Sequence, residues 1–223
     1  SGAYAWGTYK SHPYMLLNWS HRMEDVFTFA HETGHCMHSL NSNKKQEFVN
    51  SHYPIFLAEI ASTVNENILL QYMINNCDDT TDKGKKEKAY LINHFLEDVK
   101  NTVIRQTMFA EFEYIVHQKI EQGEAMTSDN LCGLYEDLLK LYFGPGLVYD
   151  EYMNHEWSRI PHFYSSFYVY KYATGFCAAA KITEKITREG ENAVGKYLEF
   201  LSSGGSDYPS NILKKLDIDM SQP

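Results

Sequence analysis

The sequence has few cysteines, few basic residues and no long apolar run. Its four cysteines in 223 residues form no C-x-x-C pair, which argues against a thiolate metal site and favours reduced thiols. Lys and Arg number 20 against 29 Asp and Glu, and the net charge of −9 opposes binding to nucleic acid or an anionic membrane. No apolar run reaches the length of about 18 residues that spans a bilayer, and no signal peptide is recognisable. We therefore expect a cytoplasmic protein without nucleic-acid or membrane partners.

The residues that are present predict one globular, mainly helical domain over residues 1–223. Hydrophobic residues make up 43% of the chain, and no repeat or linker divides it. Alternating residues predict short strands within residues 1–20, and apolar spacings of three and four predict helices over most of the rest. The expected helices cover residues 23–43, 54–77, 85–121, 128–142, 167–186, 191–201 and 211–216. The fold class is therefore α+β, predominantly α-helical, with a small β-sheet near the amino end.

The most informative stretch is His31-Glu32-Thr33-Gly34-His35, an H-E-x-x-H motif in a helix-patterned run. Residues four apart lie on one face of a helix, so His31 and His35 can direct their rings at a common metal ion. Glu32 lies about 100° around that helix, where it can activate a water on the metal. The alternative is a pair of core-facing histidines without metal. Gly34 favours the metal site, because glycine lets a second element approach closely.

A zinc enzyme site needs three protein ligands and one open position. Glu59 is the candidate third ligand, because a carboxylate on an apolar helix face is costly unless it is paired or bound to metal. Its alternative is an ordinary salt bridge at a helix edge. Glu66 lies two turns further, where it can accept the outer N–H of a ligating histidine or remain exposed. His38 is expected at the surface or beside the site, since a fourth ligand would close the metal to substrate.

Tyrosines crowd one later part of the chain. Within 24 residues the sequence places Tyr149, Tyr152, Tyr164, Tyr168, Tyr170 and Tyr172. Aromatic side chains usually pack in a core, which is one interpretation of this segment. The other is catalytic, because a tyrosine O–H can donate a hydrogen bond to a developing oxyanion without titrating at pH 7.

Three motifs together resemble one known family. F-T-F-A-H-E-T-G-H at residues 27–35, P-I-F-L-A-E-I-A-S-T at 54–63 and R-I-P-H-F-Y at 159–164 with F-Y-V-Y at 167–170 are similar to oligoendopeptidase F. This is a bacterial branch of the zinc peptidases related to thimet oligopeptidase and neurolysin. The opening residues 1–4 fit the same branch, so the resemblance covers essentially the whole chain. It implies a zincin-like, neurolysin-like catalytic domain that hydrolyses short unstructured peptides.

The resemblance also implies roles for the motif residues. It makes His31, His35 and Glu59 the ligands of one Zn²⁺ ion and Glu32 the general base. Glu66 matches a glutamate that recurs after the third ligand in the family pattern. The implied reaction is attack of a zinc-bound water on a peptide carbonyl.

A mobile segment binds substrate and stabilises the transition state in this family. Its best matches here are His162, Tyr164, Tyr168 and Tyr170, with Tyr172 as the alternative for the last position. Family members also carry a helical portion before the catalytic part. The resemblance therefore implies that this chain is the carboxyl-terminal portion of a longer bacterial enzyme and lacks an amino-terminal helical lobe.

Two other functions are compatible with the sequence. A zinc carboxypeptidase of related helical architecture needs a cation to hold the terminal carboxylate of its substrate, and Arg159 is a candidate. An inactive fragment that binds zinc or peptide is the second alternative. Glu32 argues against it, because a structural metal site has no use for a general base.

Overall fold

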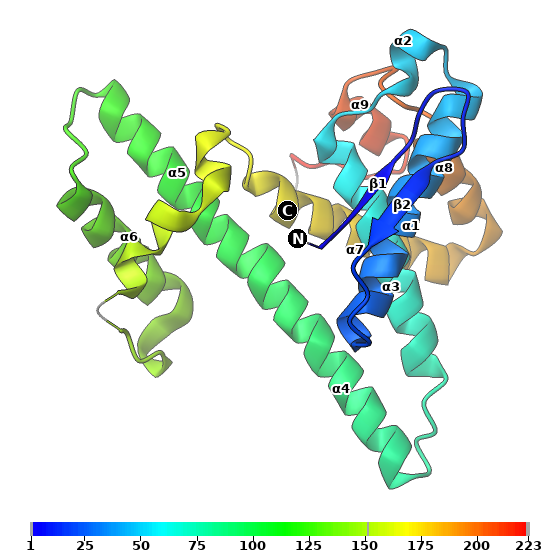
Figure 1. Ribbon diagram of the computed structural model, residues 1–223, viewed down its shortest axis with the longest axis horizontal. Helices are drawn as coiled ribbons and strands as arrows, with labels where there is room; N and C mark the ends of the chain where they lie inside the picture. Colours follow the sequence, from blue (N-terminus) through cyan, green and yellow to red (C-terminus); the bar gives the residue numbers. More distant parts are fainter. Residues whose placement is uncertain (1, 151, 222–223) are drawn as a thin grey trace. The chain divides into compact units, whose positions relative to one another are not determined.

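The computed structural model of the protein describes residues 2–150 and 152–221 (Figure 1). The chain forms two compact units, one made of Ser1–His94 with Thr174–Pro223 and the other of Phe95–Ala173. The boundaries between them fall inside two helices. Four positions of the expected domain, Ser1, Glu151, Gln222 and Pro223, lie outside the described residues.

The first unit begins with a β-hairpin followed by helices. Strand β1 (Ala3–Trp6) pairs antiparallel with β2 (Tyr14–Leu17), and both alternate between half-buried and exposed residues as their sequence predicts. The helices are α1 (Met23–Lys45), α2 (Phe48–Ser51), α3 (Ile55–Asn75), α4 (Asp82–Asp98) as far as His94, α7 (Tyr170–Glu189) from Thr174, α8 (Glu191–Leu201) and α9 (Pro209–Lys214). The expected mainly helical fold with a small amino-terminal sheet is confirmed.

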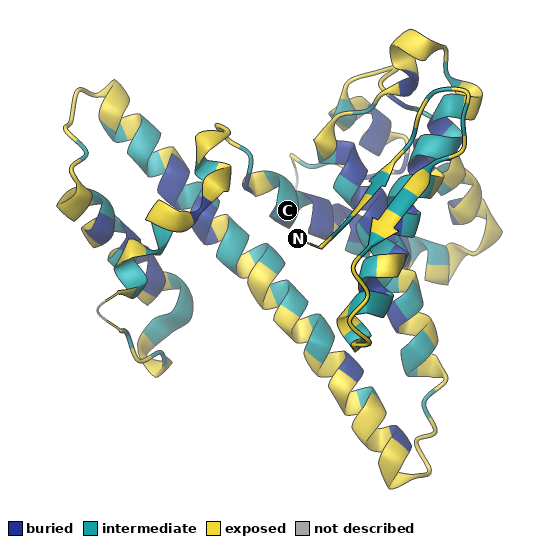
Figure 2. Ribbon diagram, in the orientation of Figure 1, coloured by how far each residue is buried: buried dark blue, intermediate teal, exposed yellow. Residues whose placement is uncertain are grey.

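The core of the first unit lies between α3 and the carboxyl-terminal helices (Figure 2). Its buried members are Leu57, Ile60, Ala61 and Val64 of α3, Ala178, Ala179 and Ile182 of α7, Phe200 and Leu201 of α8, and Ile212, Leu213, Leu216 and Ile218 in and after α9. These residues hold α3 rigidly on one side. Its other side faces α1, and that contact positions the candidate site.

Helix α1 packs against α3 at unusually short range around Gly34. A Cβ atom added at Gly34 would lie 2.6 Å from the Ser62 Cα and 2.7 Å from the Ala61 carbonyl oxygen. The two helices are also joined by a hydrogen bond, which the Asn65 side-chain amide donates to the Ala30 carbonyl at 2.6 Å. The close approach expected from Gly34 is therefore confirmed, and it brings the motif of α1 against the middle of α3.

Replacing Gly34 with alanine is expected to lower the free energy of unfolding by about 2 kcal/mol. Alanine gains about 1 kcal/mol of helix propensity, but a new methyl group 2.6–2.7 Å from backbone atoms costs about 3 kcal/mol, the upper end of the usual overpacking range. Gly195→Ala is the matched control in the same unit, because nothing lies within 4 Å of a Cβ there and the change should stabilise α8. Urea denaturation followed by circular dichroism measures both. Equal stability of the two variants would contradict the tight α1–α3 contact.

The second unit is built around α5 (Arg105–Glu121) and α6 (Ser128–Phe143). The end of α4 leads into α5 through a π-helical segment, η1 (Val99–Ile104), and three short 3₁₀ segments follow α6: η2 (Gly144–Gly146), η3 (Met153–Arg159) and η4 (Pro161–Tyr164). The core contains Met108, Phe109, Phe112, Tyr135, Leu138, Leu139, Ile160 and Val169. Of the six clustered tyrosines, Tyr149 packs against this core, whereas Tyr152, Tyr164 and Tyr170 are exposed.

The structure departs from the sequence expectations mainly at helix ends. The helix expected from residue 167 begins at Tyr170, because Phe167 has a φ of 54° that a right-handed helix does not accommodate. The last helix starts at Pro209, whose ring suits a first turn, rather than at residue 211. The short helix α2 was not expected at all. Among the residues that are described, no helix combines the length and apolarity needed to cross a membrane.

Candidate metal centre

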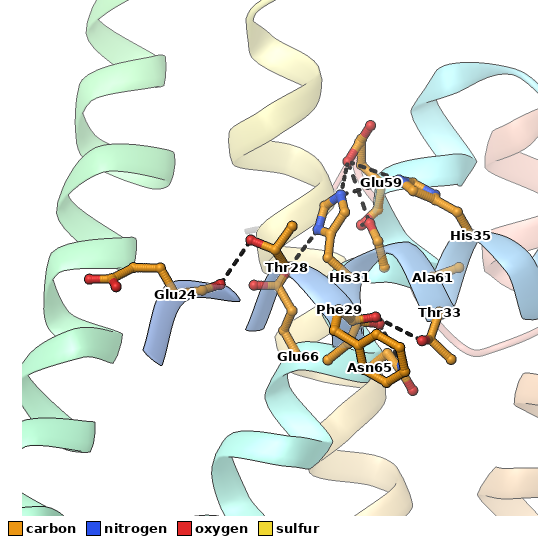
Figure 3. Close-up of polar contacts among 12 residues, drawn as sticks. Glu24, Thr28, Phe29, His31, Thr33, His35, Glu59, Ala61, Asn65 and Glu66 are labelled. Atoms are coloured by element: carbon orange, nitrogen blue, oxygen red, sulfur yellow. Dashed lines mark hydrogen bonds and ion pairs between the residues drawn. The ribbon is translucent and has the colours of Figure 1, made fainter. Parts of the chain in front are cut away.

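The two histidines of α1 and one glutamate of α3 converge on a common point (Figure 3). The His31 Nε2 and His35 Nε2 atoms are 3.1 Å apart. Glu59 Oε2 lies 3.5 Å from His31 Nε2 and 3.9 Å from His35 Nε2. All three side chains are largely buried, with 18–28% of each exposed. The partners of the Glu59 carboxylate are therefore the rings of His31 and His35.

This geometry suits a tetrahedrally coordinated divalent cation. Two ligand atoms bonded at about 2.0–2.1 Å to a tetrahedral ion lie about 3.4 Å from each other. The three observed separations of 3.1, 3.5 and 3.9 Å bracket that spacing. Two imidazoles and one carboxylate are a donor set that zinc favours, and three protein ligands leave a position open. The residues present therefore fit a catalytic metal site.

The charges of the site also favour a cation. Burial and the neighbouring His31 lower the pKa of His35 to about 4, so its ring is neutral and able to bind metal at pH 7. Burial disfavours the charged form of His31 too, but the hydrogen bond and charge of Glu66 outweigh it and raise its pKa. Burial raises the pKa of Glu59. A bound cation would favour the charged form of this carboxylate.

Glu66 contacts the His31 ring on the edge that faces away from the cluster. Its Oε1 atom lies 2.6 Å from His31 Nδ1, which is short enough for a charge-assisted hydrogen bond (Figure 3). With Nδ1–H donating to Glu66, the His31 Nε2 atom carries the lone pair and faces Glu59. Ser62 contacts Glu59 in a similar supporting way, with its Oγ atom 3.4 Å from Glu59 Oε2. The arrangement fits the orienting role that the sequence suggests for Glu66.

Glu32 is the buried carboxylate next to the cluster. Only 7% of the residue is exposed, and within residues 2–150 and 152–221 its Oε2 atom has no hydrogen-bond partner. Burial raises the pKa of Glu32, and the charges of Glu59 and Glu66 act in the same direction. An unpartnered buried oxygen is costly and is expected where a substrate or water completes the site. A raised pKa also brings the group closer to the value that suits a general base at neutral pH.

The second unit contains the other residues that the sequence singled out. The ring of His162 stacks on Tyr168 with centroids 5.5 Å apart, and its Nε2 atom lies 3.3 Å from the Tyr172 hydroxyl. Tyr164 is 89% exposed, and Tyr170 is 41% exposed at the first residue of α7. The structure therefore brings His162 and Tyr168 together with Tyr172, which the sequence offered only as an alternative.

Two further residues differ from what the sequence suggested. His38 is fully buried, and its ring stacks on Tyr53 with centroids 3.5 Å apart, so of the two expected positions the one at the surface is wrong. Its four-residue spacing from the buried Gly34 places it on the buried face of α1, which is the signal for a core position. The helix-joining role of Asn65 has no comparable signal, because asparagine is common on exposed helix faces as well.

A helical scaffold that joins an H-E-x-x-H pair to a glutamate from a second helix is typical of metallopeptidases. The fold and the site thus place the protein in that class. Comparison with known protein families agrees with this class. The model of Peptidase family M3 matches residues 1–223, and the chain belongs to this family.

Relatives within the family are similar to this chain over its whole length. The chain is 47% identical over 223 residues to oligopeptidase PepF of Bacillus subtilis, covering 100% of this chain and 32% of that protein. A solved structure from Chlamydophila abortus is 46% identical with a TM-score of 0.87, covering 100% of this chain and 37% of that one. Oligoendopeptidase-F from Enterococcus faecium is 42% identical with a TM-score of 0.77, covering 90% and 35%. The expected resemblance to oligoendopeptidase F and the zincin-like helical fold are thereby confirmed.

The chain spans about a third of the length of the relatives it matches. The family match itself covers all of this chain, residues 1–223.

Proposed function

We propose that this chain is the catalytic part of a zinc-dependent endopeptidase that hydrolyses short unstructured peptides. The observation that carries the proposal is the convergence of His31, His35 and Glu59, with the buried Glu32 beside them. Zinc fits this donor set better than calcium or magnesium, which prefer oxygen ligands alone. Two neutral imidazoles and one carboxylate leave a net positive site when a divalent ion is bound.

The residues of the chain divide the chemistry between them. A zinc ion held by these ligands supplies Lewis acidity, which polarises a carbonyl and makes water a better nucleophile. Glu32 accepts the proton of the attacking water on its carboxylate and then donates it to the leaving amine. Glu66 keeps the His31 ring in orientation through its hydrogen bond to Nδ1. His162, with Tyr168 or Tyr172, is proposed to donate hydrogen bonds to the substrate and its oxyanion.

The contacts of Arg159 weigh against a carboxypeptidase. Its guanidinium pairs with Glu156, which also pairs with Arg105 and accepts the Tyr135 hydroxyl at 2.7 Å. A cation that recognises a terminal carboxylate needs its charge available, whereas this one is shared with a carboxylate of its own. An inactive binding fragment is disfavoured by the unpartnered buried oxygen of Glu32, which costs stability and has no structural use.

The organisation of the complete protein is also a proposal. We infer that both units belong to one catalytic domain of a longer cytoplasmic bacterial polypeptide, in which an additional helical lobe contributes to peptide binding. Support comes from the relatives, since proteins named oligoendopeptidase F are about three times as long as the region that matches this chain. Short peptides are the proposed substrates.

Metal removal tests the proposed function. In the complete natural polypeptide that carries this chain, a zinc chelator is expected to abolish cleavage of a fluorogenic peptide blocked at both ends, and added Zn²⁺ should restore it, because the three ligands must hold the ion for turnover. Mass spectrometry of the products identifies internal cleavage. Cleavage that continues after the protein has lost its metal, or sequential removal of carboxyl-terminal residues from unblocked peptides only, would contradict the proposal.

A further inference from the structure

The turn that precedes Tyr168 is held by a buried carboxylate from a different element. The Phe167 backbone N–H donates to Glu113 Oε1 on α5 at 2.7 Å, and Glu113 is only 5% exposed. A carboxylate is costly to bury unless it is hydrogen-bonded, and a hydrogen bond to a charged acceptor is about twice as strong as a neutral one. This hydrogen bond between positions 113 and 167 therefore ties the turn to α5.

Phe167 needs such a tether because of its backbone conformation. Its φ of 54° lies in the left-handed region, which a bulky residue rarely adopts without support from its surroundings. The Phe167 ring, which is 45% exposed, contacts His117 one turn further along α5, with centroids 4.8 Å apart. Two successive turns of α5 thus contact Phe167. Glu113 binds its main chain, and His117 packs against its ring.

Side chains do not enclose this segment on every side. A pocket of about 220 Å³, open to the surface, is lined in part by Glu113, His117, Phe163 and Tyr164. The hydrogen bond from Phe167 to Glu113 adds a directional contact to the packing of the segment.

The turn at Phe167 determines the orientation of the Tyr168 side chain. Tyr168 follows Phe167 directly and stacks on His162, and its ring also contacts Tyr172 with centroids 5.6 Å apart. Relaxation of Phe167 to an ordinary negative φ would swing the following residue away from His162. The group of His162, Tyr168 and Tyr172 therefore keeps its arrangement only while the turn is held.

We propose that Glu113 is a positioning residue, which fixes the turn at Phe167 and so orients His162 and Tyr168 toward bound peptide. The inference rests on the proposed function for its effect on catalysis, because it assigns no chemistry to Glu113 itself. Its acceptor oxygen is used by the main chain, and it acts through the residues that follow.

The test compares three variants of the complete natural polypeptide: Glu113→Ala, Glu113→Gln and Glu111→Ala. Glu111 is the matched control, because its carboxylate also lies on α5 and accepts the Tyr142 hydroxyl at 2.6 Å without contacting the turn. Glu113→Ala should lower kcat by about 100-fold, as misplaced catalytic groups do, with unchanged zinc content. Glu113→Gln should stay within about fivefold of the wild-type kcat, since an amide oxygen still accepts a weaker hydrogen bond. Glu111→Ala should retain the wild-type kcat.

Hydrogen exchange supplies a readout that does not depend on turnover. The Phe167 amide should exchange at least about tenfold faster in Glu113→Ala than in the wild type, and at an unchanged rate in Glu111→Ala. Unchanged exchange in Glu113→Ala overturns the inference even if the protein hydrolyses nothing. Wild-type kcat in Glu113→Ala, or an equal loss in Glu113→Gln, also overturns it. Wild-type protein that cleaves no peptide contradicts the proposed function alone, and the exchange data still decide on Glu113.

Discussion

Glu32→Gln is expected to reduce peptide hydrolysis by about 10³–10⁴-fold and to leave the bound metal in place. The Glu32 carboxylate has one buried oxygen without a partner and is not among the converging ligand atoms of His31, His35 and Glu59. Glutamine has the same shape but cannot accept a proton at neutral pH. Turnover is measured with the blocked fluorogenic peptide, and metal content is measured by inductively coupled plasma mass spectrometry.

Glu24→Gln provides the control for this substitution. Glu24 lies on the exposed first turn of the same helix, so the same chemical change there should alter kcat by less than about twofold. Activity of Glu32→Gln close to that of Glu24→Gln would remove Glu32 from the mechanism. Loss of metal from Glu32→Gln would show instead that the carboxylate binds the ion, which would require a different ligand set.

Glu59→Ala is expected to show the largest loss of zinc affinity. Its Oε2 atom lies within 4 Å of the Nε2 atoms of His31 and His35, so removing it leaves this cluster with two protein ligands. A ligand loss should exceed the decrease of about 10–100-fold that is typical for residues that only orient a ligand. Competition with a chromophoric chelator measures the zinc dissociation constant, and hydrolysis should fall in parallel.

Glu66→Gln serves as the graded comparison for that experiment. Glu66 contacts His31 through Nδ1 on the ring edge away from the cluster, so its variant should lie within the range of about 10–100-fold. If Glu59→Ala binds zinc as tightly as the wild type, the assignment of the third ligand is wrong. If Glu66→Gln weakens binding as much as Glu59→Ala, a purely orienting role for Glu66 is wrong.

The sequence predicts the site on α1 and α3 in considerable detail because helical geometry is periodic. A spacing of four places His31 and His35 on one face, and a carboxylate in an apolar helix requires a partner. Gly34 predicts the close approach of the two helices, and the 2.6 Å separation between a built Cβ and Ser62 Cα agrees with that. These inferences depend only on helix periodicity and on the properties of single residues, and tertiary contacts do not change either.

The parts that the sequence does not predict depend on contacts between distant residues. Nothing near Phe167 indicates that its φ is positive, since the stabilising acceptor Glu113 lies 54 positions earlier. The pairing of Tyr172 with His162 likewise depends on how the turn folds back. The surface position offered for His38 is wrong because a polar residue type suggests exposure, whereas stacking on Tyr53 makes an imidazole acceptable in a core.

The missing side chain at position 34 has a consequence for recognising distant members of this family. In H-E-x-x-H the fourth place is usually treated as free, yet here any substituent would collide with the neighbouring main chain. A database pattern that demands glycine there, followed by a carboxylate about two dozen positions later, would discard chains whose histidines face no second helix. The fourth residue of the motif, Gly34, thus indicates how closely two helices pack. The first, second and fifth residues indicate metal binding and catalysis.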